Sequence, residues 1–314
     1  MIDEVIAELD PRPGETVCDC TLGGAGHTLE MARRIQPDGL SLGIDQDDMA
    51  LDAASARFER ELPTARRRFL KGNFDSLDDL LVQAEVPGVD CFLFDIGVSS
   101  PQLDIPERGF SYHEDAPLDM RMGPGDNTLT AAEVTNSYNE ADLARILRVY
   151  GDERNATRIA RQIVRTREKA PIETTLQLVE VIKAAIPAAG RRHGGHPARK
   201  TFQALRIEVN HEMDVLRALL EGALRVLKPG GRLSILTYHS LEDRMVKNFM
   251  RAGNIEGKVE QDFYGNRLAP MKPVNNKVIV PSAEEQAQNP RSRSAKLRVA
   301  EKCETVQGRP QHER

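Results

Sequence analysis

Apolar positions along the first hundred residues alternate between two spacings. Short, nearly continuous apolar runs predict strands, and segments with apolar residues three or four apart predict helices. Val89–Asp95 is nearly all apolar up to its last residue, which is typical of a central parallel strand covered on both faces. The predicted strands are Thr16–Cys20, a strand ending at Asp45, Arg67–Lys71 and Val89–Asp95, and the predicted helices are His27–Ile35, Met49–Glu61 and Ser76–Gln83.

The same alternation returns near the C-terminus. Phe202–Leu227 is predicted to be one long amphipathic helix, ended by Lys228-Pro229-Gly230-Gly231. Arg232–Tyr238 is a further apolar strand, and Ala295–Ala300 alternates as an edge strand would. Together these elements predict an α/β fold with a doubly wound sheet, whose functional residues lie at the carboxyl ends of the strands.

Residues 104–200 interrupt this pattern, because no strand is visible there. A loop rich in Gly, Pro and acidic residues is followed by predicted helices at Ala131–Ser137, Asn139–Tyr150, Arg154–Glu168 and Thr174–Ala185. We therefore predict an inserted helical domain at 104–200, between sheet segments 1–103 and 201–314.

Composition narrows the class of protein. The 314 residues are 40% hydrophobic and 29% charged, and no apolar run reaches the roughly 18 residues of a membrane span. No signal peptide is visible, and the four cysteines do not form a disulfide framework, so we expect a cytoplasmic protein. Because the net charge is −5, nucleic-acid binding would depend on local basic patches.

A glycine-rich turn between the first two strands is the strongest functional signal. Gly23, Gly24 and Gly26 let the backbone approach a ligand closely. Asp45 ends the second strand 22 residues after Gly23, where a carboxylate can accept hydrogen bonds from both ribose hydroxyls. This combination predicts a site for a cofactor that contains a nucleoside; the alternative is an ordinary turn whose glycines only relieve strain.

The spacing of the turn favours one cofactor. Gly-Gly-Ala-Gly is tighter than the dinucleotide motif, and no phosphate-binding P-loop is present. Asp19, just before the turn, would repel a phosphate but suits an ammonium group. A molecule with adenosine at one end and a charged amino acid at the other matches both carboxylates, which predicts S-adenosylmethionine.

Arginines at helical spacing in the insertion suggest a polyanionic substrate. Arg154, Arg158, Arg161 and Arg165 share one face of a predicted helix, opposite the apolar Ile159, Ala160, Ile163 and Val164. Arginine suits phosphate contacts, although a solvated helix face gives the same pattern. A second basic cluster, Arg291–Arg298, favours RNA.

A metal site is not expected. His193 and His196 have a spacing that metal ligands use, but no cysteine or carboxylate pair nearby completes a set of four.

Several motifs together resemble the bacterial MraW family, from about Asp3 to Glu301. They are Asp19–His27, Asp95–Asp104, Arg108–Ser111, Pro117–Met122, Thr201–Asn210, Tyr238–Arg244 and Asn289–Ser294. Its members are S-adenosylmethionine-dependent methyltransferases that modify N4 of a decoding-centre (P-site) cytidine in the 16S rRNA of the small ribosomal subunit. The resemblance implies a class I, Rossmann-like methyltransferase sheet with an inserted helical domain.

The resemblance also implies site residues. It assigns Ala25, Gly26, His27 and Asp45 to the cofactor, Phe74 to the adenine, and Asp95 and Gln102 to the same pocket. Phe74 is alternatively a core side chain, and His27 a helix cap. Family members usually begin with a His-x-Pro-Val-type segment that this sequence lacks, so we expect a misassigned start codon or a trimmed sequence.

The implied reaction needs groups that accept hydrogens from a cytosine amine. The turn Ser99-Ser100-Pro101-Gln102 loosely resembles the turn that amino-methyltransferases use, so the carbonyls of Ser99, Ser100 and Pro101 are candidate acceptors. His239 is another candidate, or else a structural histidine that bonds Glu242 or Asp243. Two other functions stay open, namely a ribosome-assembly factor without turnover and methylation of a protein or small molecule. The sequence does not decide between monomer and homodimer.

Overall fold

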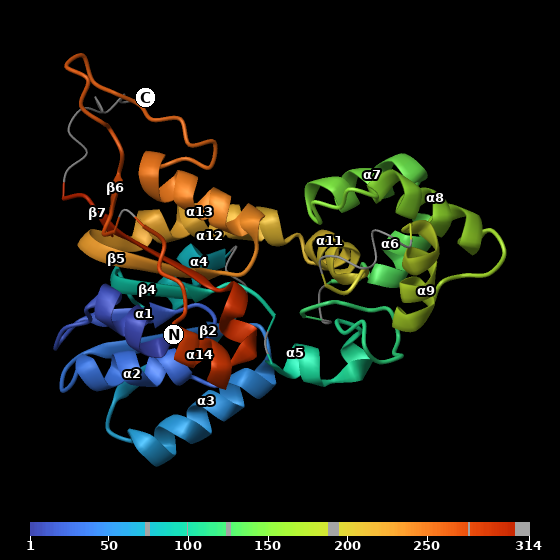
Figure 1. Cartoon of the computed structure of the whole chain (residues 1–314). Coiled ribbons are helices and arrows are strands. Elements are labelled where there is room, and N and C mark those ends of the chain that lie inside the picture. Colours follow the sequence, from blue (N-terminus) through green and yellow to red (C-terminus); the bar gives the residue numbers. More distant parts are fainter. Residues whose placement is uncertain (73–75, 99, 124–126, 188–194, 276, 305–314) are drawn as a thin grey trace. The chain divides into compact units, whose positions relative to one another are not determined.

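The chain folds into two units, which Figure 1 draws. Their structure is a computed structural model that describes residues 1–72, 76–98, 100–123, 127–187, 195–275 and 277–304, without the side chains of residues 100 and 101. Met1–Gly97 and Val215–Arg314 form the sheet unit, and Val98–Asp214 forms the helical unit. The helical unit is longer than the predicted insertion because the helix after Ala198 contributes Phe202, Leu205 and Val209 to its core.

A seven-stranded sheet in the order β3-β2-β1-β4-β5-β7-β6 is the centre of the sheet unit. β1 to β5 are parallel, whereas β7 runs antiparallel to β5 and β6. The strands are β1 (Thr16–Asp19), β2 (Leu40–Asp45), β3 (Arg66–Lys71), β4 (Val89–Asp95), β5 (Leu227–Thr237), β6 (Met271–Pro273) and β7 (Lys296–Lys302). The predicted doubly wound α/β class is confirmed, and the strand order reverses between β1 and β4, where such sheets bind ligands.

Helices cover the sheet and bury its apolar strands. Cys91, Phe92, Leu93 and Phe94 of β4 are at most 3% exposed, as predicted for a central strand. The helices of this unit are α1 (Ile2–Leu9), α2 (Gly26–Arg34), α3 (Asp48–Glu61), α4 (Leu77–Gln83), α12 (Glu212–Val226, from Val215 on), α13 (Ser240–Ala252) and α14 (Ala283–Gln288). Within the described residues, no helix combines the length and apolar character that crossing a membrane requires.

The helical unit packs around its own apolar core. Ile146 and Leu147 of one helix meet Ile159 and Ile163 of the next, and all four are fully buried. The helices are α5 (Ser100–Asp104), α6 (Ala131–Ser137), α7 (Glu140–Val149), α8 (Ala156–Arg167), α9 (Thr175–Ala185) and α11 (Arg199–Val209). Thr130 and Thr174 each form a capping box, which fixes where α6 and α9 begin.

The predictions for two secondary-structure elements were wrong. The single helix predicted over 202–227 is α11 and α12, separated at Asn210 and His211, where His211 has a φ of +49°. The strand near 295–300 is β7, which is not an edge strand, because the three-residue β6 pairs with its outer side.

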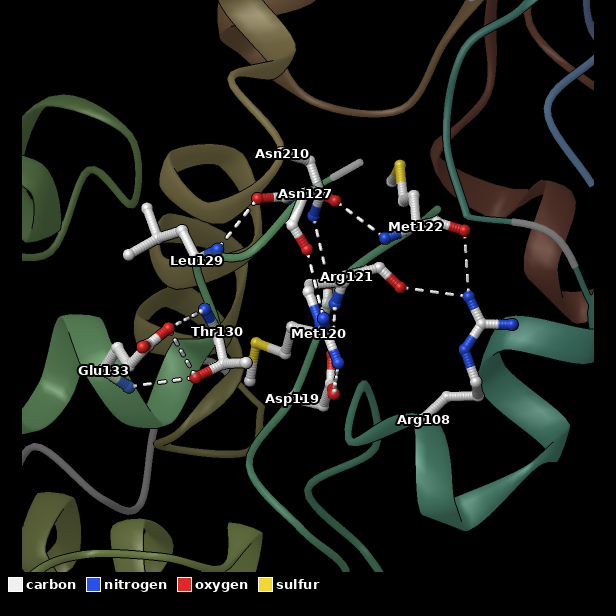
Figure 2. A network of polar contacts seen from close by, with 10 residues as sticks. All are labelled: Arg108, Asp119, Met120, Arg121, Met122, Asn127, Leu129, Thr130, Glu133 and Asn210. Atoms are coloured by element: carbon white, nitrogen blue, oxygen red, sulfur yellow. Dashed lines mark hydrogen bonds and ion pairs between the residues drawn. The ribbon is translucent and has the colours of Figure 1, made fainter. Parts of the chain in front are cut away.

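A polar network around Asn210 explains the break between α11 and α12 (Figure 2). The Asn210 amide donates to the carbonyls of Met120 (2.8 Å) and Arg206 (2.9 Å), and its Oδ1 accepts from the Met122 N–H (2.7 Å). Asn127 donates to the Val209 carbonyl at 2.7 Å. These contacts hold the loop around Met120 against the end of α11, so they stabilise the chain in a non-helical conformation there.

The same loop is held from its other side by two arginines (Figure 2). Arg108 donates to the carbonyls of Arg121 (3.0 Å) and Met122 (2.9 Å), while Arg121 forms a bidentate pair with Asp119. The motifs Arg108–Ser111, Pro117–Met122 and Thr201–Asn210 therefore meet within the helical unit.

Candidate active site

The glycine turn leaves β1 and leads into α2 in a backbone conformation that exposes it to a ligand. Gly23 and Ala25 adopt left-handed φ values of +47° and +55°. A Cβ on Gly24 would meet nothing within 4 Å, so that side of the turn is open. α2 begins at Gly26 without a side-chain cap, so its first N–H groups face outward as donors for an anionic group such as a carboxylate.

Asp19, at the end of β1, stabilises this turn through hydrogen bonds. Its carboxylate accepts hydrogen bonds from the Thr21 N–H (3.0 Å), the Thr21 hydroxyl (3.2 Å) and the Thr28 hydroxyl (2.6 Å), and the residue is only 1% exposed. The expectation that Asp19 would contact an ammonium group does not match this burial. Burial raises its pKa, against the opposing effects of His27 and Thr28.

Asp45, at the end of β2, supports the turn from the neighbouring strand. Its carboxylate accepts the Gly23 N–H (2.9 Å) and the Asp47 N–H (3.0 Å). Burial raises the pKa of Asp45, although these two N–H donors act in the opposite direction. Asp45 is only partly buried, so lone pairs of its carboxylate remain for hydroxyl groups of a ligand.

Asp95, at the end of β4, has a partner that the sequence did not reveal. Tyr238, just after β5, donates its hydroxyl to the Asp95 carboxylate at 2.7 Å. Burial, and then Asp95, raise the Tyr238 pKa well above its usual value of 10.0, so the hydroxyl stays protonated as a donor. The Tyr238 ring packs against Gly97, where a Cβ would lie 2.9 Å from the ring.

These three aspartates end three adjacent strands, in the order β2-β1-β4. Their charges influence one another, because Asp95 raises the pKa of Asp19 and Asp19 raises that of Asp45. In the described residues, no lysine or arginine forms an ion pair with any of the three. A cationic ligand would relieve this repulsion, whereas a phosphate would increase it.

His27, in the first turn of α2, has an atom that is available to a ligand. Its Nε2 is buried and forms no hydrogen bond with any described residue. A buried polar atom without a partner costs free energy, so this nitrogen is suited to contact a ligand in the turn.

Two further residues were predicted to bind the cofactor, Phe74 and Gln102. Phe74 is outside the described residues. Gln102 lies on α5, in the helical unit, where it is partly buried.

The candidate hydrogen acceptors follow β4 and β5. Ser99 is outside the described residues, and Ser100 and Pro101 form the first turn of α5. His239 caps α13, since its Nδ1 accepts the Glu242 N–H at 3.4 Å. Its Nε2 lies 2.9 Å from Glu242 Oε1 but without the geometry of a hydrogen bond, and Glu242 is 1% exposed. Both ring nitrogens of His239 therefore face Glu242, one of the two structural partners proposed from the sequence.

The predicted arginine face is exposed on the helical unit. Arg158, Arg161 and Arg165 lie on α8, whose opposite side buries Ile159, Ala160 and Ile163, as predicted. Arg154 is exposed but precedes the helix, which begins at Ala156 and not at Arg154. Arg161 pairs with Glu140 at 3.4 Å, an exposed contact of little energetic weight.

A surface hollow of about 550 Å³ lies at the end of α8. It is lined by Gln162, Arg165, Thr166, Glu168, Lys169 and Ala170. The second basic cluster, Arg291–Arg298, is less available for contacts with RNA, because Lys296 and Arg298 already contact Asp243 at 3.2 and 2.7 Å. Burial acts to raise the Asp243 pKa, but the two cations outweigh it and hold that pKa below its usual value.

Only one of the two histidines whose spacing resembled metal ligands is described. His196 stacks on Tyr112 with ring centroids 4.5 Å apart, and His193 is outside the described residues.

Comparison with known proteins decides the family. The sequence pattern of the MraW methylase family matches residues 1–303. The chain belongs to the MraW methylase family. It is 51% identical over 310 residues to the ribosomal RNA small subunit methyltransferase H of Symbiobacterium thermophilum, covering 97% of this chain and 96% of that protein. It is 48% identical over 311 residues to the protein of the same name from a Paenibacillus species, covering 96% and 98%.

Solved structures resemble the chain more distantly. TrmN from Thermus thermophilus aligns with 96% of this chain and 48% of its own, at 14% identity and a TM-score of 0.45. Family membership therefore rests on the sequence match and agrees with the strand order β3-β2-β1-β4-β5-β7-β6. As a member of this family, the protein is an S-adenosylmethionine-dependent methyltransferase.

Proposed function

We propose that the protein transfers the methyl group of S-adenosylmethionine to N4 of a P-site cytidine in 16S rRNA. The observation that carries this proposal is the group of three aspartates, Asp19, Asp45 and Asp95, at the ends of adjacent strands beside an open glycine turn. Relatives that are about half identical over nearly their whole length are named as small-subunit ribosomal RNA methyltransferases, which supports the substrate class.

The cofactor supplies an electrophilic methyl group on a positively charged sulfur. In our proposal Asp45 accepts the ribose hydroxyls, and the backbone of Ala25, Gly26 and the side chain of His27 contact the amino-acid end. Asp95 contributes negative charge, and Tyr238 holds its carboxylate in place through the 2.7 Å hydrogen bond. Phe74 stacks on the adenine and Gln102 completes the pocket, as the family resemblance implies.

During methyl transfer, the protein must orient a weak nucleophile, the cytosine amine. The lone pair of a cytosine amine is delocalised into the ring, so the amine must be held close to the methyl group while its hydrogens are accepted. Backbone carbonyls of Ser99, Ser100 and Pro101 are our preferred acceptors. His239 is less suited, since Glu242 faces both of its ring nitrogens.

RNA recognition is assigned to the helical unit. Arg154, Arg158, Arg161 and Arg165 contact phosphates in our proposal, and the hollow beside Arg165 and Lys169 extends that basic face. Their exposure and the scarcity of acidic partners support this assignment. We place the reaction on the small ribosomal subunit in the cytoplasm.

The direct test uses S-adenosylmethionine labelled in its methyl group. The purified protein is incubated separately with small ribosomal subunits and with protein-free 16S rRNA, and the RNA is digested to nucleosides. The proposal expects label in N4-methylcytidine, and the preferred substrate shows whether the subunit must be assembled. Label on carbon 5 of cytosine, or on protein alone, would contradict it.

Single-turnover rates identify the acceptor. His239→Asn keeps the helix cap, because asparagine is a favoured N-cap residue, but removes the imidazole. If His239 accepts a proton, His239→Asn and His239→Ala both lower the rate by about 100-fold or more. If the carbonyls act, His239→Asn stays near the wild-type rate and Pro101→Ala, which shifts the turn, has the larger effect. Wild-type rates in all three variants would contradict both assignments.

A further inference from the structure

Two aromatic side chains lie on the surface of the sheet unit without any cover. Phe263 is 97% exposed and Tyr264 is 86% exposed. Every other phenylalanine and tyrosine among the described residues is buried or partly buried. Two adjacent aromatic side chains form a contiguous exposed patch, which is a feature of surfaces that bind other molecules.

Phe263 and Tyr264 lie on a hydrogen-bonded turn between α13 and β6. Figure 1 shows that this segment extends away from the sheet. Asp262 accepts the N–H groups of Tyr264 and Asn266, both at 2.8 Å, and the Asn266 side-chain amide at 2.8 Å. Below the turn, the Asp262 N–H donates to the Asn266 carbonyl (2.9 Å) and the Leu268 N–H to the Glu260 carbonyl (2.9 Å). The two rings are therefore presented in an ordered backbone before any ligand binds.

The charge around the turn favours a polyanion. Residues 251–277 contain five basic and three acidic side chains, a net charge of +2 in a chain whose net charge is −5. Lys258, Arg267 and Lys272 are exposed, and none forms an ion pair within the described residues. Asp262, one of the three acids, is occupied by the turn itself.

We propose that Phe263 and Tyr264 form a stacking site for unpaired RNA bases. This inference rests on the proposed RNA substrate. The two rings meet edge to face, with centroids 5.7 Å apart and planes at 87°, so their faces point in different directions. Such a pair accepts bases that are splayed out of a helix, and exposed lysines and an arginine in the same segment suit the RNA backbone.

Replacing both rings with alanine tests whether the site binds RNA by base stacking. Phe263→Ala with Tyr264→Ala should raise the Kd for a single-stranded RNA oligonucleotide about ten-fold or more, measured by fluorescence anisotropy. The slope of log Kd against log salt should stay the same, because neither substitution removes a cation that binds phosphate. Val280→Ala is the matched control, since Val280 is an exposed apolar residue (57%) of the same unit and should change neither quantity. Melting temperatures confirm that the variants fold.

A tryptophan probe reports stacking directly. The chain contains no tryptophan, so Phe263→Trp introduces a single emitter. Single-stranded RNA should quench its emission, and fully paired RNA should quench it much less, because paired bases are already stacked. Unchanged emission together with unchanged affinity in the double alanine variant overturns the proposal.

The remaining outcomes separate this inference from its alternatives. If the double alanine variant lowers the mass in sedimentation but keeps its RNA affinity, the rings join copies of this chain and the proposal is overturned. If the protein methylates N4 of cytidine while both stacking readouts are negative, this inference alone fails. If RNA quenches the tryptophan but no cytidine is methylated, the proposed function fails and the stacking site stands.

Discussion

Replacing Asp45 with alanine removes the group that we assign to the cofactor ribose. In the structure its carboxylate also accepts the N–H groups of Gly23 and Asp47, at 2.9 and 3.0 Å. The substitution therefore acts twice, because it deletes the acceptor for the ribose and loosens the turn that lies beside it.

The expected magnitude follows from these hydrogen bonds. A hydrogen bond to a charged group contributes about 1.5–3 kcal/mol, and each 1.4 kcal/mol corresponds to a ten-fold change in Kd. Asp45→Ala should therefore weaken the binding of S-adenosylmethionine by about 10- to 150-fold.

Asp47→Ala is the matched control for this substitution. Asp47 caps α3 by accepting the Met49 N–H at 3.0 Å, so its replacement should cost about 1 kcal/mol of unfolding free energy and leave cofactor affinity unchanged.

Calorimetry with two ligands separates the ribose contact from a general charge effect. S-adenosylhomocysteine has the same ribose but lacks the sulfonium charge. If Asp45 contacts the ribose, Asp45→Ala should weaken both ligands by the same factor. A weakening confined to S-adenosylmethionine would show that Asp45 acts through its charge, and unchanged affinities in a folded variant would refute the assignment altogether.

Three further predictions follow from the same structure. Burial raises the pKa of Asp45, and ribose hydroxyls that donate to its carboxylate favour the ionised form, so S-adenosylmethionine affinity should fall as pH decreases from 7 toward 3.8; calorimetric Kd values independent of pH would contradict this. Arg158→Ala with Arg165→Ala should lower the salt slope of RNA binding by roughly 0.7–0.9 for each phosphate that is no longer neutralised, with cofactor affinity unchanged, whereas an unaltered slope would leave the face merely solvated. Asn210→Ala removes three side-chain hydrogen bonds and should lower the unfolding free energy by about 2–4 kcal/mol in urea titrations; a decrease below about 0.5 kcal/mol would show that the network does not stabilise the fold.

The parallel core of the fold could be predicted because each strand carries its signal locally. Val89–Asp95 is apolar except for Asp90 and the terminal Asp95, and the predicted range is also the observed one. The short β6, of three residues, has too few positions to show a periodicity, so β7 was taken for the edge strand. The break at Asn210 escaped prediction for another reason. The apolar pattern of a helix continues across it, and the cause is a set of hydrogen bonds to residues about 90 positions away.

For the candidate site, sequence reasoning located strand ends but not contacts between them. Asp45 and Asp95 end the predicted strands, whereas the contact between Tyr238 and Asp95 exists only because β4 and β5 are neighbours in the sheet. The burial of Asp19 also depends on tertiary structure, since Thr28 reaches it from the following helix. Tyr238 could have been suspected, because it follows an apolar strand immediately, as Asp95 closes another.

Methylation of one cytidine of the small-subunit RNA is the central activity that we propose for this chain. The most direct measurement maps N4-methylcytidine in 16S rRNA from cells that have the gene, cells that lack it, and deletion cells that express either the wild-type chain or Asp45→Ala. We predict that the methyl group disappears from a single P-site cytidine in the deletion and returns only with the wild-type chain. An unchanged methylation map in the deletion, or full restoration by Asp45→Ala at low cofactor concentration, would contradict the proposal.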